Sequence, residues 1–314
     1  MMFRNTVRLV LTNFSNVWKL LLYYIITTIV LVGILYPIVN PVFVKLSQAN
    51  VFSDIQALFN AIFSEPNNIV KSANQILVTI GQVLKVNANI FMANYILFGF
   101  IVVIVAPFMY GLGELAINEV LYGFMTSQTQ YGFTASFIKK IGKSSLLQLA
   151  KMLFIIPLNV IIVFAFYGIV KLCATGLIVN IFLSILILIA TFAFIAFKNS
   201  LFGLWAPCMA VHNVGPYKSL CLAIRSLFHN FWSVFSTAIT LLVVSIAANF
   251  IFGVFTFTAG FVITLPLSIF ALYVFNMVAY FSNQGMRFYV YPDMFITPKK
   301  IKEQETIKKL KFYL

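Results

Sequence analysis

Residues 177–197 read LIVNIFLSILILIATFAFIAF and contain no charged side chain. About 20 apolar residues in a helix match the thickness of a bilayer's hydrocarbon core, so this stretch predicts a membrane-spanning helix. A second apolar run, residues 152–172, precedes it, and only a short segment around Thr175 and Gly176 separates the two. Because a short turn forces neighbouring helices to run antiparallel, these runs predict a helical hairpin in a membrane.

Four further apolar runs extend the pattern on both sides of this hairpin. We therefore predict an all-α, polytopic integral membrane protein with six transmembrane helices, arranged as three helical hairpins, and with interfacial amphipathic helices. A short turn at Phe255-Thr256 joins the last two spans. Pro37 and Pro41 predict a tilt or kink in the first span, which is too long for a signal-peptide core and is expected to be retained. The six spans are roughly Leu20–Val44, Asn94–Gly113, Met152–Leu172, Leu177–Phe197, Val234–Phe252 and Thr258–Phe281.

The composition supports the same class. Hydrophobic residues make up 62% of the 314, the mean hydropathy is +1.01, and there are 35 phenylalanines. Only 9% of the residues are charged, against about 25% in soluble domains. A soluble enzyme, a disordered protein and a disulfide scaffold are excluded, because no soluble core could bury so much apolar surface.

The basic residues predict the orientation. The chain has 21 Lys and Arg against 7 Asp and Glu, a net charge of +14. With a cytoplasmic N-terminus, 17 basic residues lie on the inner side and four, Lys45, Lys71, Lys85 and Lys171, on the outer side. The positive-inside rule then predicts that both termini are cytoplasmic, beside anionic lipid headgroups, and nucleic acid is not an expected partner.

The chain also resembles three copies of one unit: a basic amphipathic leading segment, a span, an outer turn and a second span with a polar inner end. The leading segments are residues 13–21, 143–153 and 228–235. An offset of about 84 residues aligns Glu114 with Lys198 and then with Ser282. The alternative is that any six-span protein with a cytoplasmic N-terminus shows basic inner loops at similar spacing.

Two segments outside the spans have amphipathic patterns. Residues 1–298 are expected to form one membrane domain with an outer insertion at about 46–90. Apolar residues within 51–88 recur at helical spacing, which predicts two amphipathic helices that serve either as a packing cap or as a gate or partner-docking surface. At the N-terminus, an apolar stripe predicts an interfacial helix. Residues 299–314 are expected to form a basic cytoplasmic tail. The stripe consists of Phe3, Val7, Val10, Leu11 and Phe14.

Catalytic, metal and cofactor motifs are not found in the sequence. Gly142-Lys143-Ser144 resembles the end of a phosphate-binding loop, but the glycine required five residues earlier is Phe137. His212 and His229 lack further ligands at metal-binding spacing. The three cysteines form no C-x-x-C pair and predict neither a disulfide nor a zinc site. We expect no enzyme activity, no cofactor and no metal.

Polar residues gather at the inner ends of the second, fourth and sixth spans. Charges this close to hydrocarbon are costly unless paired or hydrated, so they are expected to face a bundle interior or an aqueous cavity. Glu114 and Lys198, aligned by the repeat, are predicted to form an ion pair; the alternative is that they snorkel separately to the headgroups. Pro107, Gly111 and Gly113 predict a kink beside them. This candidate polar inner ring comprises Glu114, Asn118, Lys198, Asn199, Asn283 and Arg287.

Residues 205–235 read WAPCMAVHNVGPYKSLCLAIRSLFHNFWSVF. This stretch resembles the membrane domain found ahead of some bacterial glycerophosphodiester phosphodiesterases, and related six-span bacterial membrane proteins of undefined role. The resemblance covers about 40 residues and implies a six-span bacterial inner-membrane protein. It implies no phosphodiesterase activity, because the soluble barrel that carries this activity has about 250 residues.

The sequence therefore predicts a multi-pass protein of a bacterial cytoplasmic (plasma) membrane without a catalytic site. It is expected to be permease-like or an accessory subunit of a transport or envelope assembly. The alternative is a stand-alone channel or secondary transporter that uses the polar inner ring. The lipid bilayer is the expected partner, and a membrane-protein partner or a second copy of the chain is left open.

Overall fold

The structure is a computed structural model that describes residues 2–64, 69–86, 88–127, 132–173, 178–291 and 294–296. It is all-α apart from one short β-hairpin, and among the described residues six helical segments are long and apolar enough to cross a membrane. The predicted fold class is confirmed. The spans run over Ser15–Gln48, Met92–Met125, Phe133–Leu172, Phe182–His212, Phe231–Phe255 and Phe261–Gln284.

The chain divides into two units. The first unit comprises residues 1–25, 110–162 and 189–314, and the second comprises residues 26–109 and 163–188. The second unit contains most of α2 (Ser15–Gln48), α3 (Val51–Ser64), α4 (Ile69–Val86), α5 (Ala88–Phe100) and a π-helical turn at Ile101–Val105. The first contains α1 (Met2–Thr12), most of α6 (Ala106–Met125), the inner parts of α7 (Phe133–Cys173) and α8 (Ile178–Gly203), α9 (Trp205–His212), α10 (Pro216–His229), α11 (Phe231–Phe255), α12 (Phe261–Gln284), β1 (Phe288–Tyr291) and β2 (Met294–Ile296).

Several helices run past their predicted ends. The second span was expected to stop at Gly113, where polar residues lower the hydropathy, but α6 continues to Met125. Leu115, Ile117 and Leu121 on this extension are at most 1% exposed. The helix therefore ends inside protein, where neighbouring helices rather than lipid cover its apolar face. A hydropathy criterion measures only the lipid-like part of such a helix.

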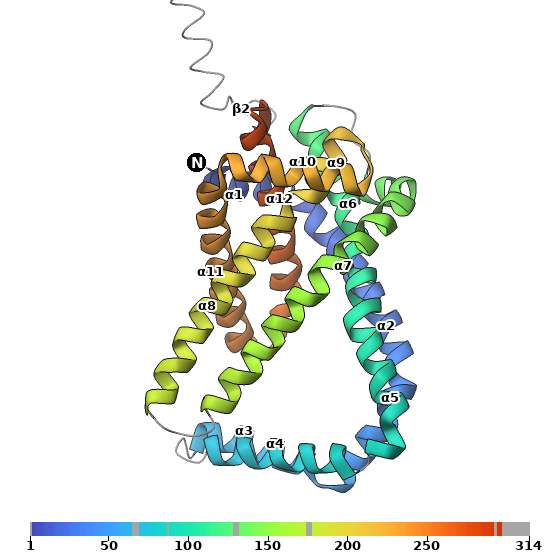
Figure 1. The fold of residues 1–314 in the computed structure, drawn as a ribbon, viewed down its shortest axis with the longest axis vertical. Coiled ribbons are helices and arrows are strands. Elements are labelled where there is room, and N and C mark those ends of the chain that lie inside the picture. The colour runs from blue at the N-terminus through green and yellow to red at the C-terminus, as the bar shows by residue number, and fades with distance from the viewer. Residues whose placement is uncertain are drawn as a thin grey trace, which may run out of the picture. The chain divides into compact units, whose positions relative to one another are not determined.

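The core of the first unit surrounds the inner half of α12, which packs against α1, α9, α10 and α11. Phe270, Phe275, Tyr280 and Phe281 are fully buried along α12. In Figure 1, α10 lies across the ends of α11 and α12. This arrangement gives the unit a protein-filled inner end. The outer surfaces of the spans, in contrast, carry many exposed apolar side chains, as expected for contact with lipid.

A turn between α9 and α10 contributes to this core. Asn213 ends α9 in the left-handed conformation (φ 52°), and Pro216 begins α10, a position at which its missing N–H costs no hydrogen bond. Trp205, 1% exposed, donates its indole N–H to the carbonyl oxygen of Pro216 at 2.8 Å and to the Ser219 hydroxyl at 3.0 Å. Trp205 thus holds the two helices together.

The two ends of the described chain lie side by side. Strands β1 and β2 form an antiparallel hairpin that the sequence analysis did not predict. Helix α1 packs on β1, and the Thr12 hydroxyl donates to the Val290 carbonyl oxygen at 3.3 Å. An even number of membrane crossings places both ends on the same side, and this contact agrees with that arrangement.

The buried face of α1 differs from the predicted apolar stripe. The stripe residues Val7 and Leu11 are 42% and 64% exposed, whereas Asn5 and Thr6 are buried. The reason is that α12 and β1 cover the adjacent face of the helix. Val10 of the stripe is buried at 8% exposed, while Val7 and Leu11 are left on the outside of the unit, where an interfacial helix would contact lipid.

The last hairpin is held by a polar clasp within the membrane-spanning segments. The amide of Asn249 on α11 donates to the Ser268 hydroxyl on α12 at 2.9 Å and accepts from the Thr264 hydroxyl at 2.7 Å. The turn begins after Phe255, as predicted, and continues through Phe257 and Thr258, both with positive φ. The turn and the clasp together set α11 antiparallel to α12.

The second unit contains both predicted amphipathic helices, α3 and α4, which lie crosswise to α2 and α5 in Figure 1. A π-helical turn at Ile101–Val105 precedes Pro107, and the residues beside Glu114, where a kink was predicted, belong to the single helix α6. Such a turn accommodates a proline one turn later, whose ring crowds the preceding backbone and which donates no N–H. The expected turn at Thr175-Gly176, Pro66 and the tail at 299–314 lie outside the described residues.

One leading segment is not a separate element. Residues 143–153 were expected to precede the third span, but α7 runs unbroken from Phe133 to Cys173. Gly142, Lys143 and Ser144 are therefore helical. They do not form a phosphate-binding loop, since such a loop must expose successive backbone N–H groups that a helix interior already uses.

Candidate functional site: a buried polar cluster

The cluster centres on an ion pair between α6 and α7. The Glu114 carboxylate and the Lys151 ammonium lie 2.5 Å apart, and the two side chains are only 9% and 8% exposed. A charge buried in this way is strongly unfavourable unless an opposite charge and hydrogen bonds compensate it. The neighbouring residues supply those bonds.

One face of α7 provides them. Ser144, Gln148 and Lys151 are four and three residues apart, so they lie on the side of α7 that faces α6. The Ser144 hydroxyl donates to the Leu112 carbonyl oxygen at 2.6 Å. The Gln148 amide donates to the Gly111 carbonyl oxygen at 2.7 Å and to the Glu114 carboxylate at 3.1 Å. A side chain at position 111 would collide with Gln148, so glycine permits this approach.

Asn118, one turn after Glu114, is fully buried beside the pair. Its amide donates to the Glu114 carbonyl oxygen at 2.8 Å. Its side-chain oxygen has no hydrogen-bond partner within the described part of the chain. Asn118 therefore extends the polar region along α6 through its bond to the Glu114 backbone.

The predicted partner of Glu114 was wrong. The Lys198 ammonium on α8 donates instead to the Asn159 side-chain oxygen on α7 at 2.8 Å. Asn159 lies eight residues beyond Lys151 on α7, about 12 Å along the axis. Lys151 reaches Glu114 because α6 and α7 pack directly at this level through Ser144 and Gln148.

Glu114 and Lys198 nevertheless line the same cavity. Its volume is about 100 Å³, and Lys151, Asn199, Tyr273 and Asn276 contribute further polar groups. The cavity brings together side chains from α6, α7, α8 and α12. Three of the six predicted ring residues, Glu114, Lys198 and Asn199, thus meet at one site.

Of the other ring residues, Asn118 lies beside Glu114, whereas Asn283 and Arg287 occupy another place. Asn283 donates to the Ser226 carbonyl oxygen at 3.2 Å and accepts from the Asn230 amide at 3.3 Å. It lines an open pocket of about 610 Å³ with Arg225 and Gln284. Arg287 follows the end of α12 and is exposed. These residues join α10 to α12 and do not reach the cavity around Glu114.

Sequence reasoning missed several members of the cluster. Lys151 was counted only as part of a basic patch, and Gln148, Asn159 and Asn276 were not singled out. Each of these amides lies within a long helix that crosses or enters the membrane. An isolated amide in an apolar run is a usable signal, because hydrocarbon offers it no hydrogen-bond partner.

A second polar contact links α9 to α12 through an imidazole, a phenol hydroxyl and a thiol, which are side chains that can act in catalysis. The His212 imidazole lies 2.7 Å from the Tyr280 hydroxyl, which donates to the buried Cys208 sulfur at 3.4 Å. Among the described residues, no carboxylate forms a hydrogen bond or an ion pair with His212, Tyr280 or Cys208. The contact holds two core helices together and does not form a nucleophile with an oriented base.

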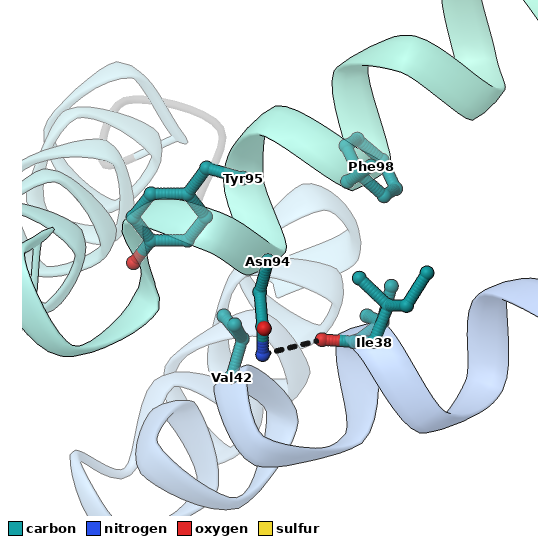
Figure 2. A pocket seen from close by; sticks show the side chains of 6 residues that line it. Ile38, Val42, Asn94, Tyr95 and Phe98 are labelled. Carbon is teal, nitrogen blue, oxygen red and sulfur yellow. Dashed lines mark hydrogen bonds between the residues drawn. The ribbon is translucent and has the colours of Figure 1, made fainter.

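A lipid-level pocket lies in the second unit. Figure 2 shows Asn94 of α5 directed at α2, where its amide donates to the Ile38 carbonyl oxygen at 3.2 Å. Pro37 and Pro41 flank this carbonyl and disrupt the helical hydrogen bonds of the same turn. Tyr95 and Phe98 are among the side chains lining the pocket, which has a volume of about 350 Å³. Asn94 thus ties α5 to α2 within the turn of α2 that carries the two prolines.

We expect Asn94→Ala to lower the free energy of unfolding by about 0.5–2 kcal/mol, since it removes one hydrogen bond between helices in an apolar surrounding. Reversible unfolding in mixed detergent micelles measures this change. Asn74→Ala, on the exposed face of α4, is the matched control and should have no effect. Equal losses from both substitutions would show that the contact between Asn94 and Ile38 carries no stability.

No protein-family model matches the chain, and no curated protein or solved structure is similar to it, so the residues themselves carry the functional argument.

Proposed function

We propose that the chain is a permease-like protein of a bacterial cytoplasmic membrane, and that the cavity around Glu114, Lys151 and Lys198 is its substrate site. The observation that carries the proposal is the convergence of three ionisable side chains on one cavity within the bundle. Ionisable residues in membrane spans are costly and typically belong to substrate or ion pathways.

A purely structural role would account for only part of this cluster. The pair formed by Glu114 and Lys151 holds α6 to α7 and is neutral as a whole. Lys198 adds a further positive charge that this pair does not require, and it donates a hydrogen bond to a neutral amide, that of Asn159. The extra charge supports a role in binding a solute.

The proposed orientation places both ends of the chain in the cytoplasm. Contact between α1 and β1 supports one common side for the two ends. The strong excess of Lys and Arg in the segments on that side supports the cytoplasmic assignment. The three-hairpin repeat is retained in the proposal, because Glu114 and Lys198 reach the same cavity from equivalent spans. Asn276 rather than Ser282 represents the third hairpin there.

The proposal includes no enzymatic step. Among the described residues, no group of three or more His, Cys, Asp or Glu side chains is placed to hold a metal ion. The side chains that line the cavity include a carboxylate and two ammonium groups but no Ser or Cys, and the nearby Ser144 hydroxyl donates to the Leu112 carbonyl oxygen. Binding and release of a solute are the chemistry that these side chains can support.

The test measures solute entry into liposomes that contain the purified protein. The liposomes are exposed to an osmotic step with sodium formate, acetate or nitrate, or with glycerol, and their change in volume is monitored by light scattering. Entry of at least one solute should be faster than in protein-free liposomes. Lys198→Gln should slow it about tenfold, because a hydrogen bond to a charged group contributes about 1.5–3 kcal/mol. Lys218→Gln, at an exposed position on α10, should leave the rate unchanged.

Two results would overturn the proposal. If the scattering traces equalled those of protein-free liposomes for every solute, transport by the chain alone would be excluded. A partner that stays bound through purification in mild detergent, and whose function is lost without this chain, would establish the accessory role in a larger assembly.

A further inference from the structure

We propose that the cavity binds a small monovalent anion, such as chloride, formate, acetate or nitrate. The inference deepens the proposed function and rests on it for its biological meaning, but binding is measured independently of transport. Three properties of the cavity carry it: its charge, its hydrogen-bond donors and its volume.

The charged groups that line the cavity sum to one positive charge. Glu114 and Lys151 cancel each other in a direct ion pair, and Lys198 has no carboxylate partner within the described residues. A cation would be repelled by this site, while an anion would neutralise it. In a surrounding of low dielectric constant, that neutralisation is a strong driving force for binding.

The free hydrogen-bonding groups include several donors. Lys198 uses one N–H on Asn159, which leaves two of the three N–H groups of an ammonium available. The side-chain amides of Asn199 and Asn276 line the cavity and have no hydrogen-bond partner among the described residues. Asn276 is only 4% exposed. A buried amide that faces a cavity without a partner favours a polar occupant, and the Lys198 ammonium, which can only donate, favours one that accepts hydrogen bonds.

The volume limits the size of the occupant. The cavity volume of about 100 Å³ is smaller than the roughly 150 Å³ of a cavity that binds benzene, which has six carbon atoms. An anion of one to four non-hydrogen atoms fits this space, whereas a sugar or a nucleotide does not. The wall is closely packed, because a Cβ atom at Gly203 would lie 2.5 Å from the Asn276 side-chain oxygen.

The experiment measures anion binding to the purified full chain in detergent. The ³⁵Cl signal of sodium chloride broadens when chloride exchanges with a protein site, and formate, acetate or nitrate should compete and narrow it. Sodium gluconate, too large for the cavity, should not compete. Thermal unfolding in the same salts at constant ionic strength provides a second readout, since a bound anion raises the midpoint in a saturable way.

Two variants change the site by different means. Lys198→Met removes the positive charge that has no carboxylate partner. Asn276→Asp replaces the amide, a hydrogen-bond donor, by a negatively charged carboxylate of similar size. Each should weaken chloride binding by about tenfold or more, the effect expected from losing a charge-assisted hydrogen bond. Lys218→Met is the matched control on the exposed face of α10, and its line broadening should equal that of the unchanged protein.

The outcomes separate the two proposals. Line broadening that persists unchanged in folded Lys198→Met and Asn276→Asp would refute the anion site, while solute entry into liposomes could still support a permease for another solute. Saturable anion binding that both variants abolish would establish the site even if no solute enters liposomes. In that case the transport proposal fails and the anion site stands.

Discussion

Glu114→Ala is expected to lower the free energy of unfolding by about 3–5 kcal/mol, the cost of breaking a fully buried ion pair. The substitution leaves the Lys151 ammonium without a counter-ion in a place that is only 8% exposed. It also removes the acceptor of one Gln148 hydrogen bond. Reversible unfolding in mixed detergent micelles should reveal this as one of the largest effects of any single polar substitution in the chain.

The chain provides its own control for this prediction. Glu119 and Lys140 form an ion pair of 2.9 Å between the same two helices, but their side chains are about twice as exposed, at 21% and 17%. Water and salt screen such a pair, so Glu119→Ala should cost only about 0–1 kcal/mol. Similar losses of unfolding free energy from Glu114→Ala and Glu119→Ala would mean that water reaches the pair of Glu114 and Lys151 and that this pair is not buried.

A charge swap identifies the partner. Glu114→Lys combined with Lys151→Glu should recover part of the lost stability, because the two charges again face each other across α6 and α7. Glu114→Lys combined with Lys198→Glu should recover much less, since Lys198 bonds to Asn159 instead. The opposite order of recovery would restore the pairing that the sequence suggested.

Trp205→Ala should lower the free energy of unfolding by about 3–5 kcal/mol, the usual cost of deleting a large buried aromatic side chain. Trp205 packs against the rings of Phe154 and Phe202, with centroids 6.2 and 6.3 Å away, and its N–H bonds to α10. The substitution therefore leaves a void and unsatisfied acceptors at the same place. Loss of near-ultraviolet circular dichroism at a lower temperature would report it.

Two further substitutions separate packing from hydrogen bonding. Trp232→Ala removes an aromatic side chain that is 76% exposed and should change the stability in detergent little. Trp205→Phe keeps much of the volume but loses the N–H, so its cost should lie between those of the other two. If Trp205→Ala cost no more than Trp232→Ala, the turn between α9 and α10 would not be part of the core.

Those features of the fold that depend on lipid as a solvent could be predicted from the sequence. Each span follows from a run of apolar residues, which is a local property, and all six are present. The helix ends could not be predicted in the same way. On α6, the stretch from Glu114 to Met125 looks too polar to span a bilayer, yet it is helical because other parts of the chain surround it.

The candidate site shows the same division. That Glu114, Lys198 and Asn199 would face an interior follows from the cost of exposing them to hydrocarbon. The partner of Glu114 depends on which helix lies beside α6 and at what height, and no local pattern contains that information. The β-hairpin at Phe288–Ile296 was missed for a related reason, since it is short and is stabilised by its contact with α1.

The contact of α1 with β1 implies an order of folding events during synthesis of the chain. Thr12 and its partner Val290 are 278 positions apart, and the ribosome needs roughly 15–60 s to make that much chain at about 5–20 residues per second. During this time α1 has already been synthesised, but α12 and β1, against which it packs in the folded protein, are still incomplete. The exposed apolar side chains of Val7 and Leu11 allow α1 to bind the membrane surface until those elements are complete. Helix α1 is thus synthesised long before the elements against which it packs.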